Sequence, residues 1–154
     1  MGYFEIGIFQ PRTSENIGTL WRTAWQLGAA GIFTIGKKQR KQTSDILNVP
    51  YRIPMRHYDT FEDFLSVRPI GARLIGVEMG GEPLAGFHHP ERAVYLVGSE
   101  TNGLSKQVLE RCDAVVELES LNYASYNLAV AGSIVLYHRF ITLGGQQPGQ
   151  PFPG

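Results

Sequence analysis

Short apolar runs alternate along this chain with segments whose apolar residues recur at helical spacing. Five apolar runs predict buried strands, at residues 3–9, 31–35, 72–79, 92–97 and 114–118. Helical spacing and capping residues predict four helices, at residues 16–27, after Asp59, after Ser105 and at residues 127–140. Because strands that alternate with helices favour a covered parallel sheet, we predict an α/β fold, with a mostly parallel sheet and helices on both faces.

The size of the chain limits this fold to one domain. With 154 residues, 43% of them hydrophobic, the chain can form one compact core but has little material for a second. We therefore expect a single domain over residues 1–143. Residues 144–154 are rich in glycine, proline and glutamine, have almost nothing to bury, and are expected to form a disordered tail.

Charge and cysteine content exclude several classes of protein. Fourteen basic and fourteen acidic residues balance, so a nucleic acid could bind only through a local basic patch. Cys112 is the only cysteine, which excludes an internal disulfide and the usual cysteine-based zinc sites. The four histidines share no ligand spacing, so we predict no metal. We see no signal peptide or membrane-spanning run and expect a cytoplasmic protein.

In a parallel sheet, ligands bind where the carboxyl ends of the strands and their loops gather. Three predicted loops lie there: residues 10–16, 98–105 and 119–127. In the first, Asn16 stands at the mouth of a helix, and Gly18 and Arg22 lie one turn apart, so the glycine leaves room for a substrate beside the guanidinium. The alternative is a capped helix with one solvated arginine.

The second loop has Gly98 and Gly103 five residues apart after an apolar strand, which lets the backbone approach a ligand closely. It lacks the Lys-Ser/Thr pair of a phosphate loop and the GxGxxG pattern of dinucleotide folds, so a triphosphate site is not expected. Glu100 can accept hydrogen bonds from Asn16, from Arg22 or from a ligand. A purely structural turn is the alternative.

The third loop ends in Ser125-Tyr126-Asn127, which opens the last helix. A hydroxyl and an amide at a helix N-terminus are first of all caps. Their functional use would be contact with a ligand that lies at the same strand ends.

Taken together and in this order, the three segments resemble the SPOUT superfamily, in its SpoU (TrmH-like) branch of RNA 2′-O-methyltransferases. The similar stretches are residues 16–24, 96–105 and 125–131, and the resemblance extends from the first strand to about residue 143. Two departures concern the ligand pocket: Glu119-Ser120 stands where many relatives have Pro-Met, and Tyr126 stands where they usually have leucine.

This resemblance implies a trefoil knot in the C-terminal third and a homodimer whose sites lie at the subunit interface. It implies that S-adenosylmethionine is the cofactor, and that Arg22 is the catalytic residue, ordered by Asn16 and Glu100. The cofactor-binding residues that it implies are Val77, Gly98, Glu100, Gly103, Leu118, Ser125 and Asn127. The nearly all-round apolar last helix suits an interface or deep burial.

The RNA partner would be held by a local cluster of cations. Phosphate contacts need clustered positive charge, which residues 37–41 offer through Lys37, Lys38, Arg40 and Lys41. A solvated loop is the alternative. The resemblance also places Tyr137 near the RNA, although aromatic residues in helices more often belong to the core.

The predicted function is therefore transfer of a methyl group from S-adenosylmethionine to a ribose 2′-hydroxyl of RNA. Because a guanidinium holds its proton at neutral pH, Arg22 could fix a phosphate and stabilise the developing alkoxide instead of acting as the base. Small stand-alone members of the branch tend to act on tRNA, including the wobble ribose. Ribosomal RNA as substrate, an inactive RNA-binding module and a small-molecule enzyme on an unknotted sheet are the alternatives.

Overall fold

The computed structural model describes residues 2–36 and 53–144, and within them the chain forms one six-stranded sheet. The strand order is β3-β2-β1-β5-β4-β6, and every pair of neighbours is parallel. The strands are β1 (Tyr3–Phe9), β2 (Gly31–Ile35), β3 (Met55–Tyr58), β4 (Arg73–Pro83), β5 (Arg92–Val97) and β6 (Ala114–Glu117). The predicted mostly parallel α/β sheet is confirmed.

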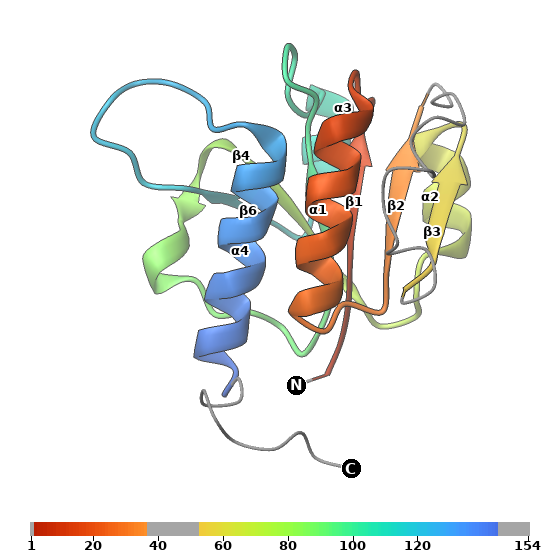
Figure 1. Ribbon diagram of the computed structural model, residues 1–154, viewed down its shortest axis with the longest axis horizontal. Coiled ribbons are helices and arrows are strands. Elements are labelled where there is room, and N and C mark those ends of the chain that lie inside the picture. Colours follow the sequence, from red (N-terminus) through yellow and green to blue (C-terminus); the bar gives the residue numbers. More distant parts are fainter. Residues whose placement is uncertain (1, 37–52, 145–154) are drawn as a thin grey trace.

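Helices cover both faces of this sheet (Figure 1). Helices α1 (Ser14–Gln26) and α4 (Leu128–Thr142) lie side by side on one face, and α2 (Phe61–Val67) and α3 (Lys106–Arg111) lie on the other. Two apolar clusters fill the layers. The larger one includes Leu20 of α1 and Val135 of α4, and the smaller one includes Phe64 of α2 and Val108 of α3.

The close approach of α1 and α4 depends on a glycine. A Cβ added at Gly132 of α4 would lie 2.7 Å from Cδ1 of Leu20, closer than side chains pack. The contact matters for function because α1 and α4 begin at the carboxyl edge of the sheet, with Ser14 and Leu128 as their first residues. Packing between them therefore fixes the relative positions of the loops that precede these helices.

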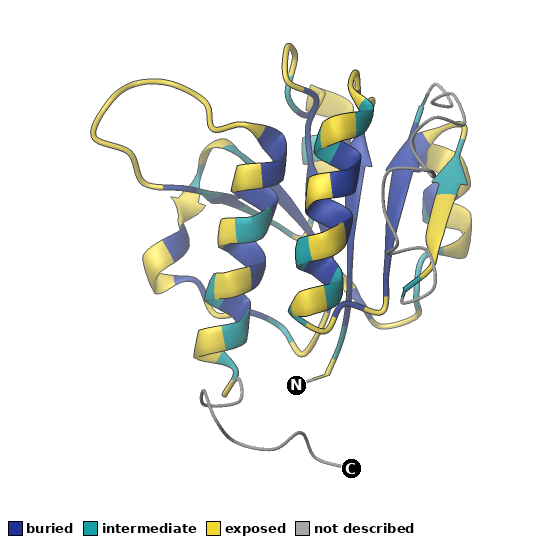
Figure 2. Cartoon of the chain, in the orientation of Figure 1, coloured by how far each residue is buried: buried dark blue, intermediate teal, exposed yellow. Residues whose placement is uncertain are grey.

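The central strands match the prediction best because they are buried on both faces. β1, β2 and β5 have the predicted bounds, and nearly all of their residues are buried (Figure 2). Strand β3 was not predicted: its sequence MRHY is polar, and its residues are half-buried or exposed at the edge of the sheet. Because β3 buries little, its sequence does not need a continuous apolar run.

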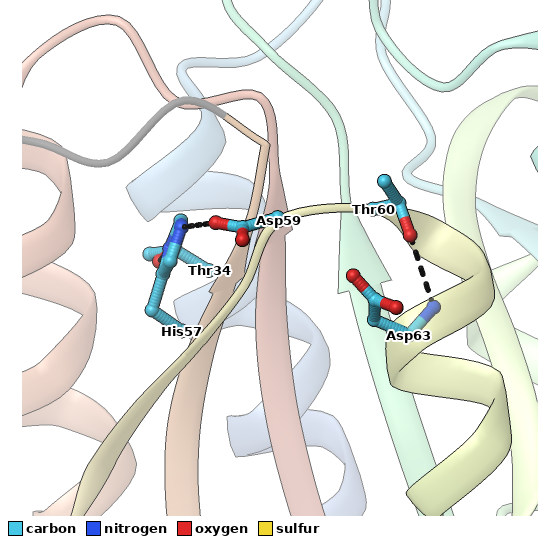
Figure 3. Close-up of polar contacts among 5 residues, drawn as sticks. All are labelled: Thr34, His57, Asp59, Thr60 and Asp63. Carbon is cyan, nitrogen blue, oxygen red and sulfur yellow. Dashed lines mark hydrogen bonds and ion pairs between the residues drawn. The ribbon is translucent and has the colours of Figure 1, made fainter.

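Two local details differ from the prediction. The residue that caps α2 is Thr60, whose hydroxyl accepts the amide of Asp63 at 3.1 Å (Figure 3), whereas the sequence suggested a capping box starting at Asp59. Helix α1 begins at Ser14 with Thr13 as the residue before it, so Asn16 lies in its first turn and not at its cap.

Helix α4 buries a charged residue on one face and exposes apolar residues on the other. Arg139 is fully buried and donates to the carbonyls of Pro90 and Glu91 and to the hydroxyl of Tyr95. The opposite face of α4 is exposed and apolar, where Val130, Ile134, Tyr137 and Ile141 are between 38% and 56% exposed. In the described ranges, no helix combines the length and apolarity needed to cross a bilayer.

Candidate active site

A cavity of about 580 Å³ opens at the carboxyl edge of the sheet. Its walls come from the end of β4, the loop after β5, the segment that follows β6, and the start of α4. This volume lies within the range of about 300–1,000 Å³ that is usual for small-molecule sites. Of the residues predicted to bind a cofactor, the cavity is lined by Val77, Gly98, Glu100, Gly103, Leu118 and Ser125.

A chain of side-chain hydrogen bonds joins the three predicted loops and meets the cavity at Glu100; Asn127, also predicted to bind the cofactor, is not among the residues of the walls. Asn127 caps α4: its Oδ1 accepts the amides of Ala129 and Val130 at 2.9 and 3.2 Å. Its Nδ2 therefore points away from the helix and donates to Oδ1 of Asn16 at 3.0 Å. The amide of Asn16 in turn donates from Nδ2 to Oε1 of Glu100 at 2.6 Å.

The direction of these bonds fixes the orientation of both amides. Backbone N–H groups can only donate, so the oxygen of Asn127 must face α4, and a carboxylate can only accept, so the nitrogen of Asn16 must face Glu100. Both constraints are met by one arrangement, in which the middle bond runs from Asn127 to Asn16. The predicted acceptance by Glu100 of a bond from Asn16 is confirmed.

The loop after β5 is folded back on itself at its two glycines. A Cβ at Gly98 would lie 2.5 Å from the amide nitrogen of Leu104. Gly103 has a φ of +61°, a backbone conformation in which residues other than glycine are strained. A bridge also pairs Ser99 with Gly103. The loop thus turns tightly, and its residues 98–104 line the cavity.

Arg22 does not reach the cavity within one chain. It lies exposed on α1, is absent from the cavity walls, and makes no hydrogen bond or ion pair with Asn16 or Glu100 in the part of the chain described. Tyr137 is 56% exposed on α4 and also lies outside the cavity. Lys37, Lys38, Arg40 and Lys41 fall outside the described residues.

Three further carboxylates line the cavity: Glu119, which the sequence marked only as a departure from the family pattern, and Glu78 and Glu117, which it did not single out. Glu119 accepts the backbone amide of Ala85 at 2.9 Å, and this hydrogen bond lowers the pKa of its carboxyl below the ordinary value. Glu78 and Glu117 stand at or next to the carboxyl end of a predicted strand. The rule that pointed to the three loops could therefore have found them.

A second polar group lies at the carboxyl ends of β2 and β3, outside the cavity walls. The ring of His57 bonds to Oγ1 of Thr34 through Nδ1 at 2.8 Å and to Oδ1 of Asp59 through Nε2 at 3.2 Å (Figure 3). Since the carboxylate can only accept, Nε2 carries the proton. With both ring nitrogens occupied and Thr34 buried, this group ties the two strands together and offers no free base.

Two of the remaining histidines pair with each other at the opposite end of the sheet. His89 bonds to the hydroxyl of Tyr95 at 2.6 Å and to His138 at 2.8 Å. Burial, and then the neighbouring charge of His138, lowers the pKa of His89 to about 4. Among the described residues, no group of three or more histidine, cysteine or acidic side chains is arranged to hold a metal.

Comparison with known proteins identifies the family. The profile of the SpoU rRNA methylase family matches residues 3–137, which include all three loops of the site. The chain belongs to the SpoU rRNA methylase family. A similar relative is an uncharacterized tRNA/rRNA methyltransferase of Archaeoglobus fulgidus, 29% identical over 129 residues, or 80% of this chain and 58% of the relative. This SpoU-family chain spans about half the length of the curated relatives that it matches.

Solved structures of the same family share the fold. A structure described as giving insights into the 2-OH methylation of C/U34 on tRNA superposes with a TM-score of 0.85 at 27% identity, covering 94% of this SpoU-family chain and 99% of the other. An AdoMet-bound rRNA methyltransferase from Sinorhizobium meliloti superposes with a TM-score of 0.83 at 25% identity, covering 92% of this chain and 57% of the other.

Proposed function

We propose that this chain methylates a ribose 2′-hydroxyl of tRNA, at the wobble nucleotide, with S-adenosylmethionine as donor. The observation that carries the proposal is the hydrogen-bonded chain Asn127–Asn16–Glu100, which meets the cavity at Glu100, because these residues come from the three separated segments that carry the family resemblance. As the substrate, tRNA is favoured by the solved structure that is described for 2-OH methylation of C/U34 on tRNA. That structure matches this chain over nearly the whole length of both chains.

The residues around the cavity fit the cofactor. Gly98 and Gly103 let the loop fold back tightly, and residues 98–104 line the cavity, so main-chain groups of this loop can bind the adenosine part. Ser125, from the segment that precedes α4, offers a hydroxyl in the cavity wall. When bound, S-adenosylmethionine supplies a methyl group on a positively charged sulfur, and carboxylates in the walls favour that charge.

Arg22 is proposed to act on the RNA. Its guanidinium can bind the phosphate next to the target ribose and stabilise the oxygen as negative charge develops on it. It keeps its own proton at neutral pH, so water or the phosphate takes the proton of the hydroxyl. Holding the hydroxyl in line with the methyl group can by itself lower the barrier by several kcal/mol.

We propose that two copies of the chain complete the site. Arg22 lies outside the cavity of its own chain, and α4 presents an exposed apolar stripe at helical spacing, formed by Val130, Ile134, Tyr137 and Ile141. Burying such a stripe against a second copy is the simplest way to remove it from water. The trefoil knot is part of the same proposal: the chain returns from edge strand β6 to place α4 against α1.

Mixing two inactive variants tests the shared site. Arg22→Ala should abolish turnover but leave binding of S-adenosylmethionine intact, and Gly98→Ala should abolish donor binding. Random pairing of the two gives mixed dimers with one intact site, so about one quarter of wild-type activity should return. Normal single-turnover methylation by Arg22→Ala would reject the role of this residue, and a mixture without activity would reject the shared site.

The substrate is tested by mapping ribose methylation in total RNA by mass spectrometry, with and without the gene. Loss of a 2′-O-methyl group at the tRNA wobble position is expected. Loss from ribosomal RNA instead would support the second candidate, which is favoured by the rRNA methyltransferase among the structural relatives. Unchanged RNA together with no binding of S-adenosylmethionine in a calorimetric titration would reject methyl transfer altogether.

A further inference from the structure

The walls of the cavity carry a marked excess of negative charge. Four carboxylates line it, and within residues 2–36 and 53–144 no lysine, arginine or histidine does. Two of them are tied to other parts of the chain: Glu100 accepts the amide of Asn16, and Glu119 accepts the amide of Ala85. Of the other two, Glu78 is the one that is hydrogen-bonded to a second wall of the cavity.

Glu78 stands where β4 leaves its regular pairing with β6. Val77 and Glu82 both pair with Val116, so residues 78–81 form a bulge in the strand. Bulges next to ligand sites commonly turn a side chain toward the ligand. Here the half-buried side chain of Glu78 lies in the cavity wall.

The carboxylate of Glu78 connects β4 to the glycine loop. Its Oε2 accepts the amide of Leu104 at 2.8 Å, and its Oε1 accepts the amide of Met79 at 2.9 Å. Its oxygens lie so close to Gly103 that no Cβ could be added at that glycine without displacing them. Because a carboxylate oxygen can accept two bonds, both oxygens can still interact with a ligand.

We propose that Glu78 is a positioning residue that also selects the charged donor over the spent product. This inference rests on the proposed function. In the transfer, the ribose oxygen bonds to the methyl carbon, the electron pair of the broken carbon–sulfur bond stays on sulfur, and the hydroxyl proton passes to water or phosphate. The sulfur thereby loses its positive charge. A fixed carboxylate in the wall favours the sulfonium and not the neutral thioether, so the product S-adenosylhomocysteine is released more readily.

The size of this selection follows from the charge. For an illustrative separation of roughly 8 Å between a carboxylate and the sulfur, Coulomb's law changes the ratio of the two dissociation constants by about twofold in a water-like medium and by about thirtyfold at an effective dielectric constant of ~20. We expect a value on the order of fivefold at this open cavity. The selection must also weaken as salt is added, since ions screen charges near the surface.

Calorimetric titration with three ligands tests the proposal. These are S-adenosylmethionine, S-adenosylhomocysteine and sinefungin, which carries an ammonium group where the donor has its sulfonium. Glu78→Gln should lower the preference for S-adenosylmethionine over S-adenosylhomocysteine by about fivefold, and sinefungin should follow the donor. Glu78→Asp keeps the charge but shortens the reach, so all three ligands should bind more weakly at an unchanged ratio.

The matched control is Glu110→Gln, which removes an exposed carboxylate of α3 outside the cavity walls and should change neither affinity nor ratio. Equal weakening of all three ligands by Glu78→Gln would leave Glu78 a loop anchor only and overturn the selection. The selection would also be overturned if the preference of the wild-type protein for S-adenosylmethionine over S-adenosylhomocysteine did not fall as salt is raised, and this measurement needs no variant. If the wild-type protein binds none of the three, the proposed function itself fails.

Discussion

Replacing Asn127 separates the two roles that the structure gives it, as the cap of α4 and as the link to Asn16. Asn127→Ala removes the acceptor for two backbone amides and the bond to Asn16. Loss of a helix cap costs typically about 1 kcal/mol, and loss of a partly exposed amide bond about 0.5 kcal/mol. For a domain of this size, about 1.5 kcal/mol corresponds to a fall in Tm of about 3–6 °C.

Asn127→Asp keeps the cap and breaks the link. The carboxylate still accepts the amides at the start of α4 and is favoured there by the helix dipole, so Tm should change by less than about 2 °C. Its second oxygen faces Oδ1 of Asn16, however, and two acceptors repel. Asn16 can turn its amide only by giving up its bond to Glu100.

We therefore expect Asn127→Asp to slow methyl transfer without lowering the stability of the protein. The fall in kcat/KM should be on the order of tenfold, equivalent to about 1.4 kcal/mol. Thermal denaturation followed by circular dichroism gives Tm, and transfer of labelled methyl groups to bulk tRNA gives the rate. Full activity of a stable Asn127→Asp protein would show that the bond between the two asparagines is not needed, and an unchanged Tm of Asn127→Ala would refute the capping argument.

Three more outcomes follow from particular contacts. Gly98→Ala should abolish binding of S-adenosylmethionine in calorimetry, because the new methyl group meets the backbone of the folded-back loop, whereas Gly86→Ala, where a Cβ has open space, should bind normally. The folded chain holds His89 neutral because burial lowers its pKa from 6.5 to about 4, so unfolding takes up a proton in that range. Tm should therefore fall as pH is lowered from 6.5 to 4, and less steeply in His89→Gln. If Lys37, Lys38, Arg40 and Lys41 contact the RNA backbone, a charge-neutral variant of these four residues should bind RNA more weakly and with a shallower salt dependence, as measured by filter binding at several salt concentrations. An RNA affinity that this variant leaves unchanged at every salt concentration would reject that contact.

The parts of the fold that could be predicted are those where one physical requirement dominates the sequence. A parallel strand buried on both faces must be a continuous apolar run, which is why β1, β2 and β5 were predicted with their bounds. Strand β3 has no such requirement at the edge and was missed. The bulge in β4 depends on how β4 pairs with β6, which comes later in the chain, so no local sequence pattern predicts the bulge.

The candidate site was predictable to the extent that topology brings its parts together. Carboxyl ends of parallel strands meet at one edge, so Asn16, Glu100 and Asn127 could be expected to be neighbours from their places alone. The hydrogen bonds of Glu78 could not, because they depend on how far the glycine loop folds back. The burial of Arg139 could not be predicted either: its spacing puts it on the buried face of α4, but the carbonyls of Pro90 and Glu91 and the hydroxyl of Tyr95 that accept its hydrogen bonds lie far away in the sequence.

The charge of the cavity limits what can enter it, and this bears on how the proposed reaction is divided between two chains. A wall with four carboxylates and, in the described residues, no cation repels the phosphates on either side of a target ribose. Only the ribose edge itself can approach the donor, so the phosphates must be held by cations outside the cavity. Arg22 is such a cation, exposed on α1 and outside its own cavity. A guanidinium inside the pocket would oppose the sulfonium that the pocket has to bind, so the place of Arg22 outside its own cavity supports the proposed arrangement, in which a second copy of the chain supplies this guanidinium.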